Sequence, residues 1–481
     1  MALPRLHART STPRSALGVS RRGFVGLLGA GAATAGVGAV AGAPLAHAAT
    51  PSGSGLTSAS LPAPSSPAYW DAVRRLFMLD KDILFMNVGT VGSPPREVLD
   101  RVDNVHREVA AGAIAAYSNF ADVREVAARG YGCDPDELVV SHNTSDGMSK
   151  IIAGLALKEG DEILTTNHEH SGGNVPMALA RDRLGVVIKR VALPVGNDQR
   201  AEDYVALFRK AITSRTKVLL FSAPTYKTGT MLPIRMLAKL AQEYGLTTVV
   251  DGAHIPGMMA YDFHELGVDF LAGSAAKWQC GPGGTGILYI RNKVIAAHNP
   301  NPLPEFWPVV SSGYPSEGGR PARSNGPTAS YDIAADLQSV GNGSLAVMAG
   351  VREVCEVWDR IGRQRIQDHV LGLSSHLREL VVERWGVKSL YSPKDDPRLV
   401  CALTSFAPFS DPRDVFDGQK TTKLVQRLKD EYGIVIRTSD FPVIGSAKPH
   451  SVIRVSTHLF HQKADVERVV NALWTLSRDM S

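Results

Sequence analysis

The sequence is poor in cysteine, with four such residues in a chain of 481 (Cys133, Cys280, Cys355 and Cys401). No two of them form a C-x-x-C pair, so neither a zinc knuckle nor a thioredoxin-type redox site is expected. Spacing alone leaves their oxidation state open. We expect free thiols that are mostly buried, because an unpaired cysteine behaves as a small apolar residue.

Long apolar runs are also missing. Beyond the N-terminus, no uninterrupted apolar segment reaches the roughly 20 residues that a membrane-spanning helix needs. Hydrophobic residues make up 44% and charged residues 21% of the chain, which is an ordinary globular composition. These values exclude a disordered chain, a collagen-like chain and a polytopic membrane protein. The length suggests two or three domains with ample core.

Most of the chain carries no surplus of charge. The sequence has 52 Lys and Arg residues and 47 Asp and Glu residues, a formal net charge of +5. Residues 1–48 contain no acid and five arginines: Arg5, Arg9, Arg14, Arg21 and Arg22. The remainder has 47 basic and 47 acidic residues, so its overall charge gives no reason to expect a nucleic-acid partner.

The order of residues 1–48 is typical of an export signal. Arg21-Arg22 precede an Ala/Gly-rich apolar run, and Ala46-His47-Ala48 has the A-x-A form of a cleavage site. Paired arginines before a weakly hydrophobic run indicate the twin-arginine route to the periplasm or the outside. A membrane anchor is the alternative, and the seven glycines between Gly23 and Gly42 disfavour it. Residues 49–68 follow as a Ser/Pro-rich linker.

Short β-rich runs alternate with amphipathic segments from about residue 137. This alternation predicts an α/β fold with a mostly parallel seven-stranded sheet, in which ligands collect at the carboxyl ends of the strands. We place this large domain at 69–345 and a smaller α+β domain at 346–481. The large-domain strands are expected at 137–141, 162–166, 186–191, 216–222, 246–251, 268–273 and 286–291. The small domain is expected to have a long helix at about 345–384, strands near 398–406, 433–437 and 451–456, and a last helix at 463–478.

Two motifs point to other functions. Gly281–Gly286 matches the G-x-G-x-x-G fingerprint, but it leads into a strand rather than a helix, so we interpret it as a turn. Ser274-Ala-Ala-Lys277 and Lys227-Thr-Gly229 match the S-x-x-K and K-T-G motifs of penicillin-binding and β-lactamase enzymes. Their order along the chain is reversed and S-D-N is missing, so a serine acyl-transferase stays a minor alternative.

A carboxylate and a lysine follow two successive predicted strands. Asp251 and His254 end one strand, Lys277 follows the next, and residues 142–148 form a polar loop before a helix. A pyridoxal phosphate (PLP) pocket needs a nucleophilic lysine of lowered pKa and a carboxylate for the pyridinium nitrogen. It also needs backbone N–H donors at a helix N-terminus for phosphate. The sequence therefore indicates a PLP site.

In this order the motifs resemble those of the class V aminotransferase family of fold-type-I PLP enzymes, and most closely its isopenicillin N epimerase-like members. The resemblance covers roughly residues 75–478. It is carried by Phe85-Met-Asn87-Val-Gly89-Thr-Val-Gly92-Ser-Pro94, Asn143-Thr-Ser-Asp-Gly147, Glu169-His170, Asp251-Gly-Ala-His254, Ser274-Ala-Ala-Lys277-Trp278 and Ile453-Arg454-Val-Ser456.

The resemblance implies a role for each matched residue. Lys277 would hold PLP as a Schiff base and move the substrate α-proton, and Arg454 would clamp the substrate carboxylate. The other cofactor-binding residues would be Asp251 at the ring nitrogen, His254 and Tyr226 at the ring hydroxyl, His170 stacked on the ring, and Thr144, Ser145 and Ser274 at the phosphate. Asn87 would contact substrate, and His170 is a candidate second acid–base group. A homodimer is implied, with residues 326–328 loosely matching an element that reaches the neighbouring subunit's phosphate.

The departures from the family pattern limit the function. Ala276 stands where the family usually has histidine, and residues 436–442 lack the nucleophilic cysteine that desulfurases carry there. We therefore expect an exported PLP enzyme acting at the α-carbon of an amino acid or peptide-derived natural product, as an epimerase, aminotransferase or lyase. A non-catalytic exported binding protein on the same fold is the second possibility. No metal is expected.

Overall fold

The computed structural model describes residues 56–480, except 319–322, 324, 327 and 329–330. All described residues belong to one compact unit. The predicted export signal, the linker up to residue 55 and Pro327 of the loosely matched element lie outside the described residues. Within them, no helix combines the length and the hydropathy that crossing a bilayer would require.

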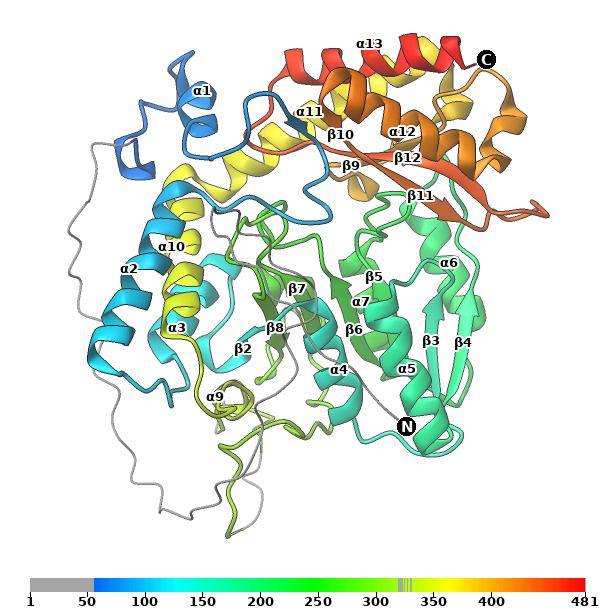
Figure 1. Cartoon of the computed structure of the whole chain (residues 1–481). Coiled ribbons are helices and arrows are strands. Elements are labelled where there is room, and N and C mark those ends of the chain that lie inside the picture. Colours follow the sequence, from blue (N-terminus) through cyan, green and yellow to red (C-terminus); the bar gives the residue numbers. More distant parts are fainter. Residues whose placement is uncertain (1–55, 319–322, 324, 327, 329–330, 481) are drawn as a thin grey trace, which may run out of the picture. The chain divides into compact units, whose positions relative to one another are not determined.

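A seven-stranded sheet flanked by helices forms the centre of the larger part of the fold (Figure 1). Its strand order is β2-β8-β7-β6-β5-β3-β4, and β8 alone runs in the opposite direction to the other six strands. The prediction of a mostly parallel seven-stranded sheet is confirmed. The strands are β2 Leu138–Ser141, β3 Glu162–Thr166, β4 Val187–Val191, β5 Thr216–Ser222, β6 Thr247–Gly252, β7 Phe270–Ser274 and β8 Gly286–Ile290.

Apart from the edge strand β4, which is partly exposed, the strands of this sheet are buried on both faces, which is why they are mostly apolar runs in the sequence. Consecutive residues point to opposite faces of a strand, and Val249 and Val250 of β6 accordingly belong to two different apolar clusters. Leu219 and Leu220 of β5 divide in the same way. The accompanying helices are α1 Tyr69–Arg74, α2 Arg96–Gly112, α3 Ala121–Tyr131, α4 Thr144–Gly154, α5 Ser171–Leu184, α6 Ala201–Ala211, α7 Ile234–Tyr244, α8 Phe263–Leu266 and α9 Ile333–Gln338.

The C-terminal part contains a three-stranded antiparallel sheet of order β11-β12-β9. Helices α11, α12 and α13 pack around it and share its apolar core (Figure 1). Its strands are β9 Leu403–Phe406, β11 Arg437–Phe441 and β12 His450–Ser456, and its helices are α10 Leu345–Ile361, α11 Arg363–Trp385, α12 Gly418–Tyr432 and α13 Lys463–Asp479. The predicted last helix is confirmed.

The prediction of one long helix at 345–384 is wrong. Two helices, α10 and α11, meet at Gly362, whose φ is 97°. A helix cannot continue through that backbone conformation, and it is one that residues with a Cβ rarely adopt. The predicted strand at 433–437 is also divided. Its first part, β10 (Ile434–Val435), pairs in parallel with β1 (Leu84–Phe85) and lies beside it in Figure 1.

Candidate active site

Several predicted site residues lie at the carboxyl ends of the inner strands of the central sheet. Strands β5, β6 and β7 are parallel neighbours, and the register pairs Ser222 with Asp251 and Gly252 with Gly273. Their carboxyl ends therefore lie side by side, and the residues that follow these strands lie at the same end of the sheet. This arrangement brings Asp251, His254, Ser274 and Lys277 to the same end of the sheet.

Lys277 lies in a turn that the N-terminal segment supports. The amide of Gly92 donates to the carbonyl of Ala276 at 2.8 Å. A Cβ on Gly92 would lie 2.0 Å from the carbonyl oxygen of Lys277, so no other residue fits without moving the backbone. The glycine turn that the sequence placed near residue 92 thus packs directly against the lysine segment.

The Lys277 amine is poised to act as a base and nucleophile. Burial lowers its pKa to about 8, while the negative charge of Asp251 acts in the opposite direction. A substantial fraction of the amine is therefore uncharged at neutral to mildly alkaline pH, which nucleophilic attack requires. Within the described chain, we find no hydrogen-bond partner for its Nζ.

Asp251 is a buried carboxylate at the end of β6. The amide of Ala253 donates to its Oδ1 at 3.2 Å. Burial raises its pKa, and the positive charge of Lys277 partly offsets this effect. The glycines at the start of α5 bring that helix close, since a Cβ on Gly173 would lie 3.9 Å from Asp251 Oδ2. A buried carboxylate in this position is suited to pair with a cation such as a protonated ring nitrogen.

Glu169 is a second buried carboxylate in the same region, to which the sequence motifs assigned no separate role. It accepts hydrogen bonds from Ser222 Oγ at 2.5 Å and from Thr166 Oγ1 at 2.6 Å. Burial raises its pKa to about 7, the Ser222 hydroxyl lowers it, and the nearby charge of Asp251 raises it further. Only the pairing of β5 with β6 brings Ser222, and with it Glu169, beside Asp251.

The protonation of His254 is fixed by its neighbour Trp278. The indole Nε1–H of Trp278 donates to His254 Nδ1 at 3.0 Å. An indole nitrogen can only donate, so Nδ1 must be the acceptor and the ring proton must lie on Nε2. Burial lowers the pKa of His254 well below its usual range, and the Lys277 charge lowers it further. His254 is therefore neutral and presents an N–H donor, which the oxygen of a ring hydroxyl can accept.

We expect Trp278→Phe to release this tautomer. Loss of the indole donor leaves Nδ1 without a partner, so both neutral tautomers of His254 become populated and cofactor affinity falls about fivefold to tenfold. Nitrogen-15 chemical shifts of labelled histidine report the tautomer, and absorbance titration reports the affinity. The matched control is Trp358→Phe, because buried Trp358 donates to the carbonyl of Gly257 instead. A tautomer that is unchanged in Trp278→Phe would refute this role.

The N-terminus of α4 has the features of a phosphate site. Asn143 caps the helix by accepting from the amide of Asp146 at 3.0 Å. The hydroxyl of Thr144 is buried without a hydrogen-bond partner in the described structure. Ser145 Oγ faces the start of α5, where a Cβ on Gly172 would lie 2.5 Å from it. Helix N-termini attract anions through their free N–H groups and dipole, so this donor set fits the phosphate of PLP.

Arg454 is a buried cation without an anion. Its Nη1 donates to the carbonyl of Tyr226 at 2.8 Å, and its Nη2 contacts Thr90 Oγ1 at 3.4 Å. Its Nε has no hydrogen-bond partner, and no carboxylate lies within ion-pair distance among the described residues. Burial lowers the pKa of the guanidinium, which nevertheless remains charged near neutral pH because its ordinary value is so high. A buried, uncompensated charge is unfavourable unless a ligand supplies the counter-ion.

The remaining predicted residues lie around this centre. His170 is the N-cap of α5, where its Nδ1 accepts from the amide of Gly172 at 3.0 Å. Its ring meets that of Tyr226 edge to face, with centroids 5.0 Å apart. Asn87 Oδ1 accepts from the Thr90 hydroxyl at 2.9 Å, and so joins the group around Arg454 through Thr90.

The cysteines and the glycine-rich motif have structural roles. All four cysteines are free and buried, as expected. Burial raises the pKa of the Cys280 thiol, so this residue is not a ready nucleophile. The G-x-G-x-x-G match ends where β8 begins, at Gly286, which confirms that it is a turn before a strand.

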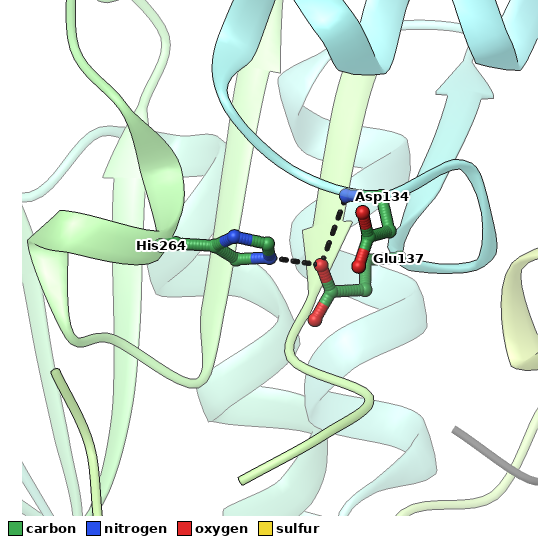
Figure 2. Close-up of side chains that lie close together, drawn as sticks. All are labelled: Asp134, Glu137 and His264. Atoms are coloured by element: carbon green, nitrogen blue, oxygen red, sulfur yellow. Dashed lines mark hydrogen bonds and ion pairs between the residues drawn. The ribbon is translucent and has the colours of Figure 1, made fainter. Parts of the chain in front are cut away.

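A cluster of Asp134, Glu137 and His264 lies just before β2, and therefore near the amino end of that strand. Figure 2 shows the three side chains. The atoms of the cluster are close enough to consider a metal ion, but every group already has a partner. His264 Nε2 contacts Glu137 Oε2 at 2.5 Å, the amide of Asn292 donates to Glu137 Oε1 at 3.0 Å, and Lys293 pairs with Asp134. We interpret it as an ion-pair network, because a metal would have to displace these contacts.

Known proteins similar to this chain share its fold and include PLP-dependent enzymes. The profile of the family described as Aminotransferase class-V matches residues 96–305. The chain is 28% identical over 420 residues to isopenicillin N epimerase of Amycolatopsis lactamdurans, covering 85% of this chain and 99% of that protein. It is 24% identical over 426 residues to a probable cysteine desulfurase of Pyrococcus abyssi, covering 85% and 98%. Its fold matches a mutant of C-DES with glycine linked covalently to the PLP cofactor, with a TM-score of 0.66, 21% identity and coverage of 83% and 98%.

Proposed function

We propose that this chain, a homologue of the PLP-dependent class V aminotransferase family, is an enzyme acting at the α-carbon of an amino acid or of a peptide-derived natural product. One juxtaposition carries the proposal. Half-buried Lys277, whose pKa is lowered to about 8 by desolvation, follows β7, and the buried carboxylate of Asp251, within electrostatic reach of it, ends the neighbouring strand β6. Desolvation together with a specific charge partner is the usual signature of a catalytic amine.

The residues present are of the types that PLP needs. Lys277 would carry it covalently, Asp251 would pair with its ring nitrogen, and Thr144 with the free amides of α4 would bind its phosphate. Bound PLP serves as an electron sink for the negative charge that develops at the substrate α-carbon. The serine acyl-transferase alternative receives no support, since the relatives and the fold are those of PLP enzymes.

The chain's own groups supply the proton transfer and the orientation. The uncharged Nζ of Lys277 accepts the α-proton on one face of the substrate and can return it. Arg454 holds the substrate carboxylate and thereby fixes which bond to the α-carbon faces Lys277. His170 is our candidate acid–base group for the opposite face, which epimerisation needs and transamination or elimination does not.

Cysteine desulfuration is a less suitable function for this chain. The relatives include probable cysteine desulfurases, but the stretch that enters β11 contains no cysteine. The four cysteines elsewhere are buried. No described thiol is therefore placed to accept sulfur as a persulfide.

We further propose export and dimerisation. The paired arginines, the apolar run and the A-x-A site of residues 1–48 support twin-arginine export to the periplasm or the outside. That route suits an enzyme that folds around its cofactor before transport and then tailors a secreted metabolite. A homodimer is proposed from the resemblance to relatives over nearly their full length.

Exchange of the α-hydrogen in deuterated water tests this function. The purified protein loaded with PLP is incubated with a panel of amino acids and mass spectrometry follows deuterium uptake, with chiral chromatography for epimerisation. We expect uptake at the α-carbon for at least one substrate class, because every proposed outcome passes through loss of that proton. A protein that binds PLP but exchanges no amino acid or peptide would favour the non-catalytic binding protein instead.

A further inference from the structure

A second arginine lies directly across the sheet from Arg454. Strands β11 and β12 are antiparallel, and their register pairs Arg437 with Arg454. Residues directly opposite in such a pair have side chains on the same face, with Cβ atoms about 4.5–5.5 Å apart. Two guanidinium groups therefore emerge together from the small sheet.

That face of the small sheet is turned toward the large domain. Arg454 donates to the carbonyl of Tyr226, and Ser439, two residues beyond Arg437 on the same face of β11, donates from its Oγ to the carbonyl of Lys227 at 2.9 Å. The side chain of Lys227 also reaches the carbonyl of Asp440. These contacts hold β11 over the segment after β5, at the carboxyl edge of the central sheet.

Neither arginine has an acidic partner among the described residues. Arg437 is exposed, and its Nε donates to the carbonyl of Thr438 at 3.0 Å. Its positive charge nevertheless acts on the site, because it contributes to lowering the pKa of Lys277 and of Arg454. Arg437 is thus a cation without a carboxylate partner, within electrostatic reach of the reacting centre.

This arrangement is costly in the absence of a ligand. Like charges directly opposite on neighbouring strands repel each other, and the burial of Arg454 adds the cost of desolvation. One carboxylate would compensate one guanidinium. A ligand with two anionic groups would pair with both arginines, the buried one and the exposed one, and Lys227 adds further positive potential on the same side.

We propose that Arg437 and Arg454 together select amino acids whose side chain carries a second carboxylate. Arg454 binds the α-carboxylate and Arg437 binds the second one. The inference rests on the proposed function and adds a substrate class to it. Arg437 is the residue that distinguishes acidic from neutral side chains.

Ligand binding provides a test that does not depend on turnover. Calorimetry on the PLP-loaded protein compares glutarate with butyrate, which differs by lacking the second carboxylate. We expect glutarate to bind at least about tenfold more tightly, and this difference to disappear in Arg437→Glu. The matched control is Arg413→Gln, which alters an exposed arginine that pairs with Asp411 on the surface. Equal binding of the two acids to the unmodified protein would overturn the inference.

Exchange kinetics provide the second test. We expect a glutamate or 2-aminoadipate preference over glutamine of about 10–100-fold in kcat/KM, mostly through KM, because a remote carboxylate contributes the same binding before and during the reaction. Arg437→Glu should reverse the preference toward lysine or ornithine. If the protein exchanged neutral amino acids as well as acidic ones, the inference about Arg437 would be overturned while the proposed function would stand. Loss of all exchange, with glutarate binding intact, would overturn the proposed function alone.

Discussion

Lys277→Ala is expected to abolish covalent attachment of the cofactor and to reduce α-hydrogen exchange by at least about 10³-fold. The reason is that, in the proposed function, the amine of Lys277 serves both as the attachment point and as the base. The unmodified protein with PLP should absorb at roughly 410–430 nm, as a lysine-bound cofactor does. The substitution should remove that band while the protein remains folded by circular dichroism.

Lys227→Ala is the matched control, since Lys227 lies close to the same site but contacts the carbonyl of Asp440. It should retain the band. If the band survived in Lys277→Ala and disappeared in Lys227→Ala, the cofactor would be attached to the other lysine. If no band formed in the unmodified protein even with added PLP, the enzyme hypothesis itself would be refuted.

The pH dependence follows from the same residue. Burial lowers the pKa of Lys277 to about 8, so its nucleophilic, uncharged form increases as the pH rises toward 8 and is nearly complete about one unit above it. The rate at which the protein freed of cofactor takes up PLP should therefore rise from about pH 6.5 and level off near pH 9. An ordinary surface lysine would instead show a rate that still increases beyond about pH 10.

Arg454→Gln is expected to have the second-largest effect, a loss of about 10²–10³-fold in kcat/KM. A charged hydrogen bond contributes about 1.5–3 kcal/mol, and a carboxylate held by a guanidinium makes two of them. The loss should appear in both kcat and KM, because the same contact binds the substrate and orients its α-carbon. Steady-state exchange kinetics with the best substrate measure this effect.

Stability should change in the opposite direction to activity. Arg454 is buried without a counter-ion in the described structure, so replacing it by a neutral side chain removes a desolvation cost. We expect the melting temperature of Arg454→Gln to remain equal to that of the unmodified protein or to exceed it. A variant that melts clearly earlier would show that Arg454 stabilises the fold rather than serving a ligand.

The strands of the large domain and several site residues could be predicted from the sequence because their signals are local. A strand buried on both faces is a continuous apolar run, so each run named in advance became one strand of the central sheet. Asp251 ends one such run, and Lys277 comes four residues after the next. Because neighbouring parallel strands have their carboxyl ends at the same end of the sheet, the proximity of Asp251 and Lys277 follows from the strand order alone.

The helix break and the protonation of His254 could not be predicted in this way. Apolar periodicity continues across Gly362, and only the positive φ adopted there separates α10 from α11. The sequence shows that Trp278 follows Lys277. Its hydrogen bond to His254 depends on how two turns pack, each of which follows a different strand.

The sequence by itself was enough to indicate PLP as the cofactor, because Lys277, Asp251 and the candidate phosphate loop at 142–148 each lie next to a strand that can be recognised locally. The tertiary structure decided which charges face each other. Register between β11 and β12 places Arg437 opposite Arg454, and register between β5 and β6 places Ser222 beside Asp251. A shift of one residue in either pairing would turn these side chains to the other face. These registers depend on packing between segments that are distant in the sequence, so they can be known only from the folded structure.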